Sequence, residues 1–108
     1  MSKVQIERIK KMESYLDEST AAIRELSEAL EKYESIQDKY YELEAYYGSE
    51  NWLADYDADS AGEFPDDLKR GVLSEDAVYD LITEHRELMA GLQRAVLRCL
   101  ESNQAKGE

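Results

Sequence analysis

The sequence has few residues that interrupt helices. Its 108 residues include five glycines and one proline, too little punctuation for a many-stranded sheet, whereas Glu, Leu, Ala and Lys are abundant and favour helix. A chain of this length suits one domain with a modest core. We therefore expect an all-α fold, with a single helical domain over residues 1–101 and a flexible tail over residues 102–108.

Long apolar runs and cysteine pairs are also missing. No apolar run approaches the roughly 20 residues that span a bilayer, and the opening residues MSKVQIERIKKM lack the apolar block of a secretory signal. The single cysteine, Cys99, cannot form an internal disulfide, which fits a reducing compartment. We expect a cytoplasmic protein that does not associate with membranes.

Motifs for catalysis and cofactor binding are absent as well. The sequence contains no phosphate-binding glycine loop and no serine nucleophile motif. His85, the single histidine, lies on an apolar stripe without a neighbouring ligand or orienting group, so we interpret it as a core residue. Cys99 has no evident basic partner and is also interpreted as core. We expect no enzyme activity and no cofactor.

Basic residues are missing from one stretch of the chain. The formal net charge is -12, and residues 40–68 contain nine acidic side chains and no basic one. Such charge repels phosphate backbones, so we expect no direct binding of nucleic acid. The same stretch holds seven of the ten aromatic residues. A functional surface is therefore expected within residues 40–68.

The first feature that is present in abundance is helical periodicity. Apolar residues recur at alternating spacings of three and four, with Ser19 filling the one gap, which is typical of a coiled-coil seam. After Tyr33 the pattern shifts by one residue, so the helix overwinds there or turns toward a different partner. Gly48 stands where a left-handed cap is expected, and we predict a helix over residues 3–47. The seam consists of Ile9, Met12, Leu16, Ile23, Leu26, Leu30 and Tyr33.

A second long helix is predicted over residues 75–100, with Ser74 as its N-cap. Packed antiparallel as a coiled-coil-like hairpin, this shorter helix would reach back only to about Thr20 on the first one. The apolar residues before that point would then be uncovered. Either the first helix breaks and folds back near residues 17–20, or a second copy covers it, and we favour a homodimer. The candidate dimer seam is Ile6, Ile9, Met12 and Leu16.

Residues 48–74 connect the two helices and are too numerous for a structureless loop. Ser49 is expected to cap a short helix, and Pro65 to open a further turn that Gly71 closes. In a structural interpretation, the connecting segment closes the end of the helical hairpin by packing the side chains of Trp52, Tyr56, Phe64 and Leu68 there. In a functional one, the segment docks a partner, with Tyr47, Trp52, Asp55, Tyr56, Asp57, Asp59 and Phe64 as candidate contact residues.

The stretch DYDADSAGEF, residues 55–64, begins like a calcium-binding loop, with an aspartate at every second position. Such a loop needs glycine at its sixth position and a bidentate glutamate at its twelfth. Ser60 and Asp66 stand at those positions instead. Two defining positions fail, so we expect no specific calcium site and no metal ligands.

A longer stretch resembles a known family. The residues YYGSENWLADYDADSAGEFPDDLKRGVLSEDAVYDL, with the heptad helix before them, resemble the small bacterial family called domain of unknown function 4298 (DUF4298). The resemblance runs from about Ile6 to Leu92. It implies an intracellular, mostly helical bacterial protein, and it supplies no catalytic or cofactor residues. Its distinctive positions are Tyr47, Gly48, Trp52, Asp55, Gly62, Pro65, Leu68, Lys69, Arg70, Gly71, Leu73, Ser74, Asp76 and Tyr79.

These features leave more than one function open. The first hypothesis is a non-enzymatic helical protein–protein interaction or scaffold module, in which residues 40–68 dock a basic protein surface. The alternative is an acidic nucleic-acid mimic that inhibits a DNA-binding protein or nuclease. Charge concentrated in one segment favours docking, and charge spread in a double row favours mimicry. A purely structural oligomer, the third possibility, predicts that charge reversal within residues 40–68 changes no phenotype.

Overall fold

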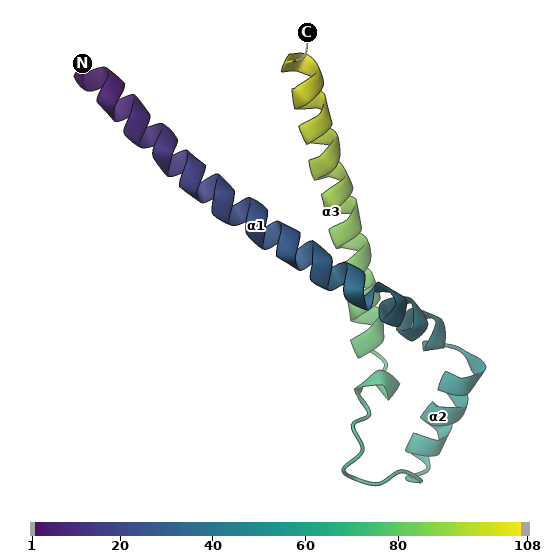
Figure 1. Cartoon of the computed structure of the whole chain (residues 1–108). Coiled ribbons are helices and arrows are strands. Elements are labelled where there is room, and N and C mark those ends of the chain that lie inside the picture. The colour runs from purple at the N-terminus through teal and green to yellow at the C-terminus, as the bar shows by residue number, and fades with distance from the viewer. Residues whose placement is uncertain (1, 107–108) are drawn as a thin grey trace. The chain divides into compact units, whose positions relative to one another are not determined.

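The computed structural model describes residues 2–106, which form helices and no strand. The elements are α1 (Lys3–Tyr46), α2 (Glu50–Ser60), the 3-10 helix η1 (Gly71–Leu73) and α3 (Ala77–Lys106), shown in Figure 1. The all-α class is confirmed, with a long helix toward each end and short helices in the segment between them. The antiparallel, coiled-coil-like packing of the two long helices stays a prediction.

Helix α1 is continuous from its cap to its last turn. Ser2 Oγ accepts from the Gln5 N–H, and Gln5 Oε1 accepts from the Ser2 N–H, both at 3.1 Å, which is a capping box. The alternative in which the chain breaks near residues 17–20 is wrong, because no glycine or proline interrupts the backbone hydrogen bonds there. Gly48, at φ 80°, provides the predicted left-handed turn after the helix.

The chain divides into two compact units, and the boundary lies inside α1, between Tyr40 and Tyr41. The boundary follows closely on the shift of the apolar pattern after Tyr33. From Tyr41 onward the residues of α1 belong to the second unit, where Leu43 lines a groove together with residues near the start of α3. The prediction of one domain over residues 1–101 stays a prediction.

The core of the second unit lies around η1, which contacts both α2 and α3. Leu73 of η1 and Val78 of α3 are buried. Pro65 opens a single turn, in which its carbonyl accepts from the Leu68 N–H at 3.1 Å. Gly71 does not close that turn as predicted, because it forms the first residue of η1. An apolar groove of about 400 Å³ runs beside η1 and is lined by Leu43, Lys69, Gly71, Val72, Ala77, Val78 and Leu81.

The Ser74 hydroxyl binds at the start of α3 as predicted, but the helix begins at Ala77, two residues later than predicted, and extends further than predicted at its other end. Ser74 Oγ accepts from the Ala77 N–H at 3.2 Å, which confirms the cap. The helix continues to Lys106, so residues 102–106 of the predicted tail are helical, and residues 107–108 lie outside the described residues. Cys99 is exposed, so its interpretation as a core residue is wrong. His85 is half-buried.

Candidate interaction site

The site begins at the short connection between α1 and α2. Ser49 Oγ accepts from the Trp52 N–H at 3.2 Å and donates to the Tyr46 carbonyl at 2.6 Å. The first bond satisfies a free N–H at the start of α2, and the second ties this cap to the last residue of α1. The predicted cap is confirmed, and it fixes the direction in which α2 leaves α1.

Three aromatic rings gather on one side of α2, and we call Tyr47, Trp52 and Tyr56 the aromatic cluster. The rings of Tyr47 and Trp52 meet edge to face, with centroids 5.3 Å apart and planes at 69°. Trp52 and Tyr56 lie one helical turn apart and stack, with centroids 5.3 Å apart and planes at 25°. Both arrangements are preferred geometries of aromatic pairs. The cluster is therefore an ordered unit of packing.

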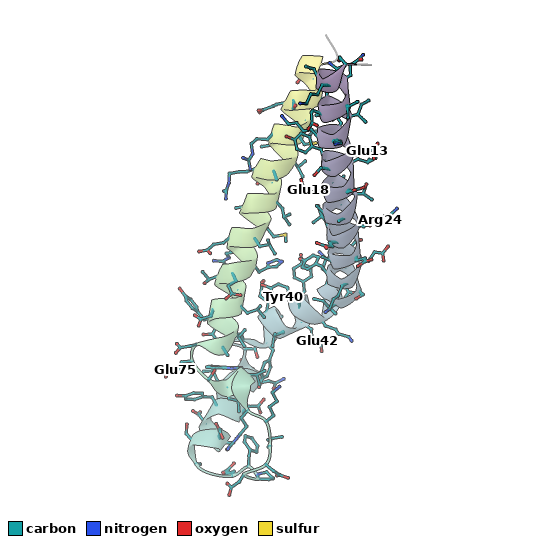
Figure 2. All side chains as sticks on the ribbon, turned by 90° about the vertical axis from the view of Figure 1, so that its left-hand side faces the viewer. Glu13, Glu18, Arg24, Tyr40, Glu42 and Glu75 are labelled. Carbon is teal, nitrogen blue, oxygen red and sulfur yellow. The ribbon has the colours of Figure 1, made fainter. Side chains whose placement is uncertain are left out.

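The polar atoms of the aromatic cluster bind the chain that leads into α3. Trp52 Nε1 donates to the Val72 carbonyl at 2.9 Å, and the Tyr47 hydroxyl donates to the Glu75 carbonyl at 3.2 Å. The Tyr56 hydroxyl donates to Glu75 Oε1 at 3.3 Å. Glu75, labelled in Figure 2, lies two residues before the start of α3. These bonds join α2 to η1 and to the residues before α3, so Trp52 and Tyr56 have a structural role.

Two aspartates of α2 also bind within the second unit. Asp55 Oδ2 accepts a 2.6 Å hydrogen bond from the Tyr46 hydroxyl. That bond, together with burial and the charge of Asp55, raises the pKa of Tyr46 to about 12. Asp59 Oδ1 lies 2.6 Å from Arg70 Nη1, and both side chains are roughly one-third exposed. Each aspartate therefore ties α2 to a neighbouring segment.

Residues 55–60 of the DYDADSAGEF stretch are helical, which differs from the loop of a calcium site. Asp55, Asp57 and Asp59 all lie within α2, whereas calcium ligands come from a turning loop whose oxygens converge on one point. Successive helical residues are about 100° apart around the axis, so Asp57 lies on the side opposite Asp55 and Asp59. Among the described residues, no group of three His, Cys, Asp or Glu side chains is placed to hold a metal ion.

Beside the aromatic cluster, α2 carries three exposed residues at spacings of three and four, and we call Glu50, Leu53 and Asp57 the outer face. Leu53 is 51% exposed, and a carboxylate lies about one turn before it and one turn after it. Asp57 is among the contact residues predicted from the sequence, whereas Glu50 and Leu53 were not predicted. The signal was available, because residues three and four positions apart share a helix face, and Glu50, Leu53 and Asp57 have these spacings.

The remaining predicted residues are placed as follows. Phe64 is half-buried in the turn after α2, and Leu68 is 48% exposed. The four candidate seam residues of α1 are 40–58% exposed, so the chain presents them to solvent. They belong to the first compact unit, and the aromatic cluster belongs to the second. The seam and the cluster are therefore two separate candidate surfaces.

Comparison with known sequences identifies the family. None of the described helices contains a segment that is long and apolar enough to cross a bilayer. No curated protein and no solved structure matches the chain. The family described as "Domain of unknown function (DUF4298)" matches residues 9–94, which include most of α1, the whole connecting segment and over half of α3. The chain therefore belongs to the DUF4298 family.

Proposed function

We propose that this protein is a non-enzymatic helical interaction module that docks a basic protein surface through the outer face of α2. The observation that carries the proposal is the exposed Leu53 between Glu50 and Asp57. Neither carboxylate forms an ion pair within the described residues. Leu53 supplies apolar contact area, and the two carboxylates are available to lysine or arginine side chains of a partner.

The rigidity of α2 supports this role. The cap, the aromatic cluster and the Asp59–Arg70 pair hold the helix from both ends and along its inner side. A surface that is already ordered loses less conformational entropy on binding than a flexible one. Tyr47, Trp52 and Tyr56, predicted from the sequence as docking residues, therefore contribute by holding the outer face in place.

The charge around α2 supports a basic partner. Residues 40–68 contain nine acidic side chains and no basic one. Such a concentration of charge accelerates encounter with a positive surface and makes the encounter sensitive to salt. Because residues 40–68 carry -9 of the formal net charge of -12, the partner is expected to contact a limited patch.

The nucleic-acid mimic receives less support from the same residues. A mimic needs a row of free carboxylates spaced like phosphates, and two of the three aspartates in α2 are bound internally. Asp59 in addition has its charge balanced by Arg70. Docking through a local face therefore accounts for the arrangement better, and competition by DNA distinguishes the two functions.

We also propose that the protein is a homodimer in a bacterial cytoplasm. The exposed seam of α1 supports the dimer. The free, exposed thiol of Cys99 fits a reducing compartment, and the family resemblance supports a bacterial source. Light scattering at micromolar concentration tests the dimer, and fractionation of source cells with an antibody tests the compartment.

Charge reversal on the outer face tests the docking proposal. The Glu50→Lys, Asp57→Lys variant should lose partners that the wild-type chain captures from an extract of its own source cells. The matched control is Glu84→Lys, Glu87→Lys, which makes the same change of net charge at exposed positions of α3. Equal capture by all three chains would contradict the proposal, and release of the partner by added DNA would favour the mimic.

A further inference from the structure

Most apolar residues of α1 in the first compact unit are exposed to solvent. α1 is the only element in the described part of this unit, and Figure 1 shows it as an unbroken helix. A long helix draws most of its stability from packing an apolar face. Here that face is more than half exposed at most positions. The exposed fractions are 56% for Ile9, 50% for Met12, 58% for Leu16, 67% for Ile23, 62% for Leu26 and 52% for Leu30.

The spacing of this face fits a coiled coil with another helix. Residues 9–33 keep the heptad phase for about three and a half repeats, which is the length at which such a pattern becomes diagnostic. Ile9, Leu16, Ile23 and Leu30 occupy the first core position of the heptad, and Met12, Ser19, Leu26 and Tyr33 the second. At 1.5 Å per residue the seam is about 37 Å long.

The residues beside the seam identify the partner and its direction. In a parallel coiled coil, with core positions a and d, the residue at position g of one helix lies beside a residue at position e of the other helix. That residue stands five positions further along the sequence. Arg8 of one copy then meets Glu13 of the other, and twofold symmetry makes this contact twice. Glu13 is labelled in Figure 2, and neither residue forms an ion pair within the described residues.

An antiparallel arrangement of the two helices places the charged residues beside the seam less favourably. In an antiparallel pair with the same overlap, Arg8 would lie beside Ile36 and Glu34 beside Ile6, so neither charge would meet an opposite one. Ser19 would face Ile23, whereas in the parallel pair the two Ser19 hydroxyls face each other. A polar residue in the core of a coiled coil favours the register in which it faces the same polar residue of the other helix.

We propose that residues 9–33 form a parallel, in-register coiled coil with a second copy of this chain, closed by two Arg8–Glu13 contacts between copies. The inference deepens the proposed homodimer and rests on it. Both chains leave a parallel coiled coil at the same end, so two outer faces of α2 are tethered to that end. A partner with two basic patches, or two copies of one partner, would then bind with a raised effective concentration.

Charge exchange tests the contact between copies. Arg8→Glu and Glu13→Arg should each weaken the dimer, because each replaces two attractive contacts by two repulsive ones, with a rise of about tenfold or more in the dimer Kd. The double variant should restore the wild-type Kd, and an equimolar mixture of the two single variants should form heterodimers. Sedimentation velocity gives the Kd, and circular dichroism confirms equal helix content.

Cross-linking tests the direction of the helices. In a Cys99→Ser background, Met12→Cys should form an intermolecular disulfide under mild oxidation, because identical core positions face each other only in the parallel register. Glu18→Cys, on the outer side of α1, is the control and should remain uncross-linked. These measurements need no partner protein, so their failure is distinct from failure of docking by α2. A monomeric wild type would overturn the proposal. A dimer whose Met12→Cys variant forms no intermolecular disulfide would also overturn it.

Discussion

Replacement of Trp52 should release α2 from the rest of the second unit. Trp52 donates to the Val72 carbonyl at 2.9 Å and contacts the rings of Tyr47 and Tyr56. The hydrogen bond contributes about 1 kcal/mol, and each ring contact adds about 0.5–1.5 kcal/mol beyond the burial of apolar area. For a half-buried ring, Trp52→Ala should therefore cost about 3 kcal/mol, near the lower end of core tryptophan truncations.

Amide hydrogen exchange of residues 50–60 is the suitable assay, because the helical signal of α1 would dominate circular dichroism. A loss of about 3 kcal/mol lowers the protection of α2 roughly 100-fold if these residues exchange by opening of the second unit. Trp52→Phe keeps an aromatic ring but removes the donor, and should cost about 1 kcal/mol.

Leu53→Ala is the matched control for Trp52→Ala. Leu53 is adjacent in sequence but lies on the outer face, where it is 51% exposed. Its truncation should change the protection of α2 by less than the Trp52→Phe variant does. An equal loss of protection in Leu53→Ala and Trp52→Ala would refute the structural role of the aromatic cluster, because an exposed residue outside the cluster would then contribute as much as Trp52.

Two further predictions concern Tyr46 and the glycines. The pKa of Tyr46 is raised from 10.0 to about 12, so the neutral form of its hydroxyl stabilises the folded chain. This contribution to stability should be fully present below pH 10 and be lost as the pH rises to about 12. Comparison of urea midpoints from pH 9 to 12 should show a smaller decline for Tyr46→Phe than for wild type, and parallel declines would contradict the Tyr46–Asp55 bond. Gly48→Ala should destabilise by about 1–2 kcal/mol, because Gly48 has φ 80°, whereas Gly91→Ala should stabilise by about 0.5–1 kcal/mol, because the added methyl group makes only an ordinary contact with Arg94 at 3.7 Å. Thermal unfolding measures both glycine effects, and shifts of the same sign would contradict this difference.

The helices could be predicted because they depend on local sequence preferences. The apolar spacing of α1, the caps at Ser49 and Ser74 and the turn at Gly48 depend on residues within about four positions of each other. Such preferences act in any context, so the sequence alone determined the all-α class and the approximate bounds of α1 and α2. The extension of α3 to Lys106 was missed, because SNQAKGE carries no apolar spacing that indicates helix.

The distribution of roles within residues 40–68 was decided by tertiary contacts. Composition showed that this segment is acidic and aromatic, but Asp55 binds Tyr46 nine residues away and Asp59 binds Arg70 eleven residues away. Trp52 reaches the Val72 carbonyl twenty residues along the chain. Pairings at such distances depend on how α2, η1 and α3 pack, and no local pattern encodes them. The tertiary structure thus separated the aspartates that hold α2 in place from Asp57, which remains exposed beside Leu53.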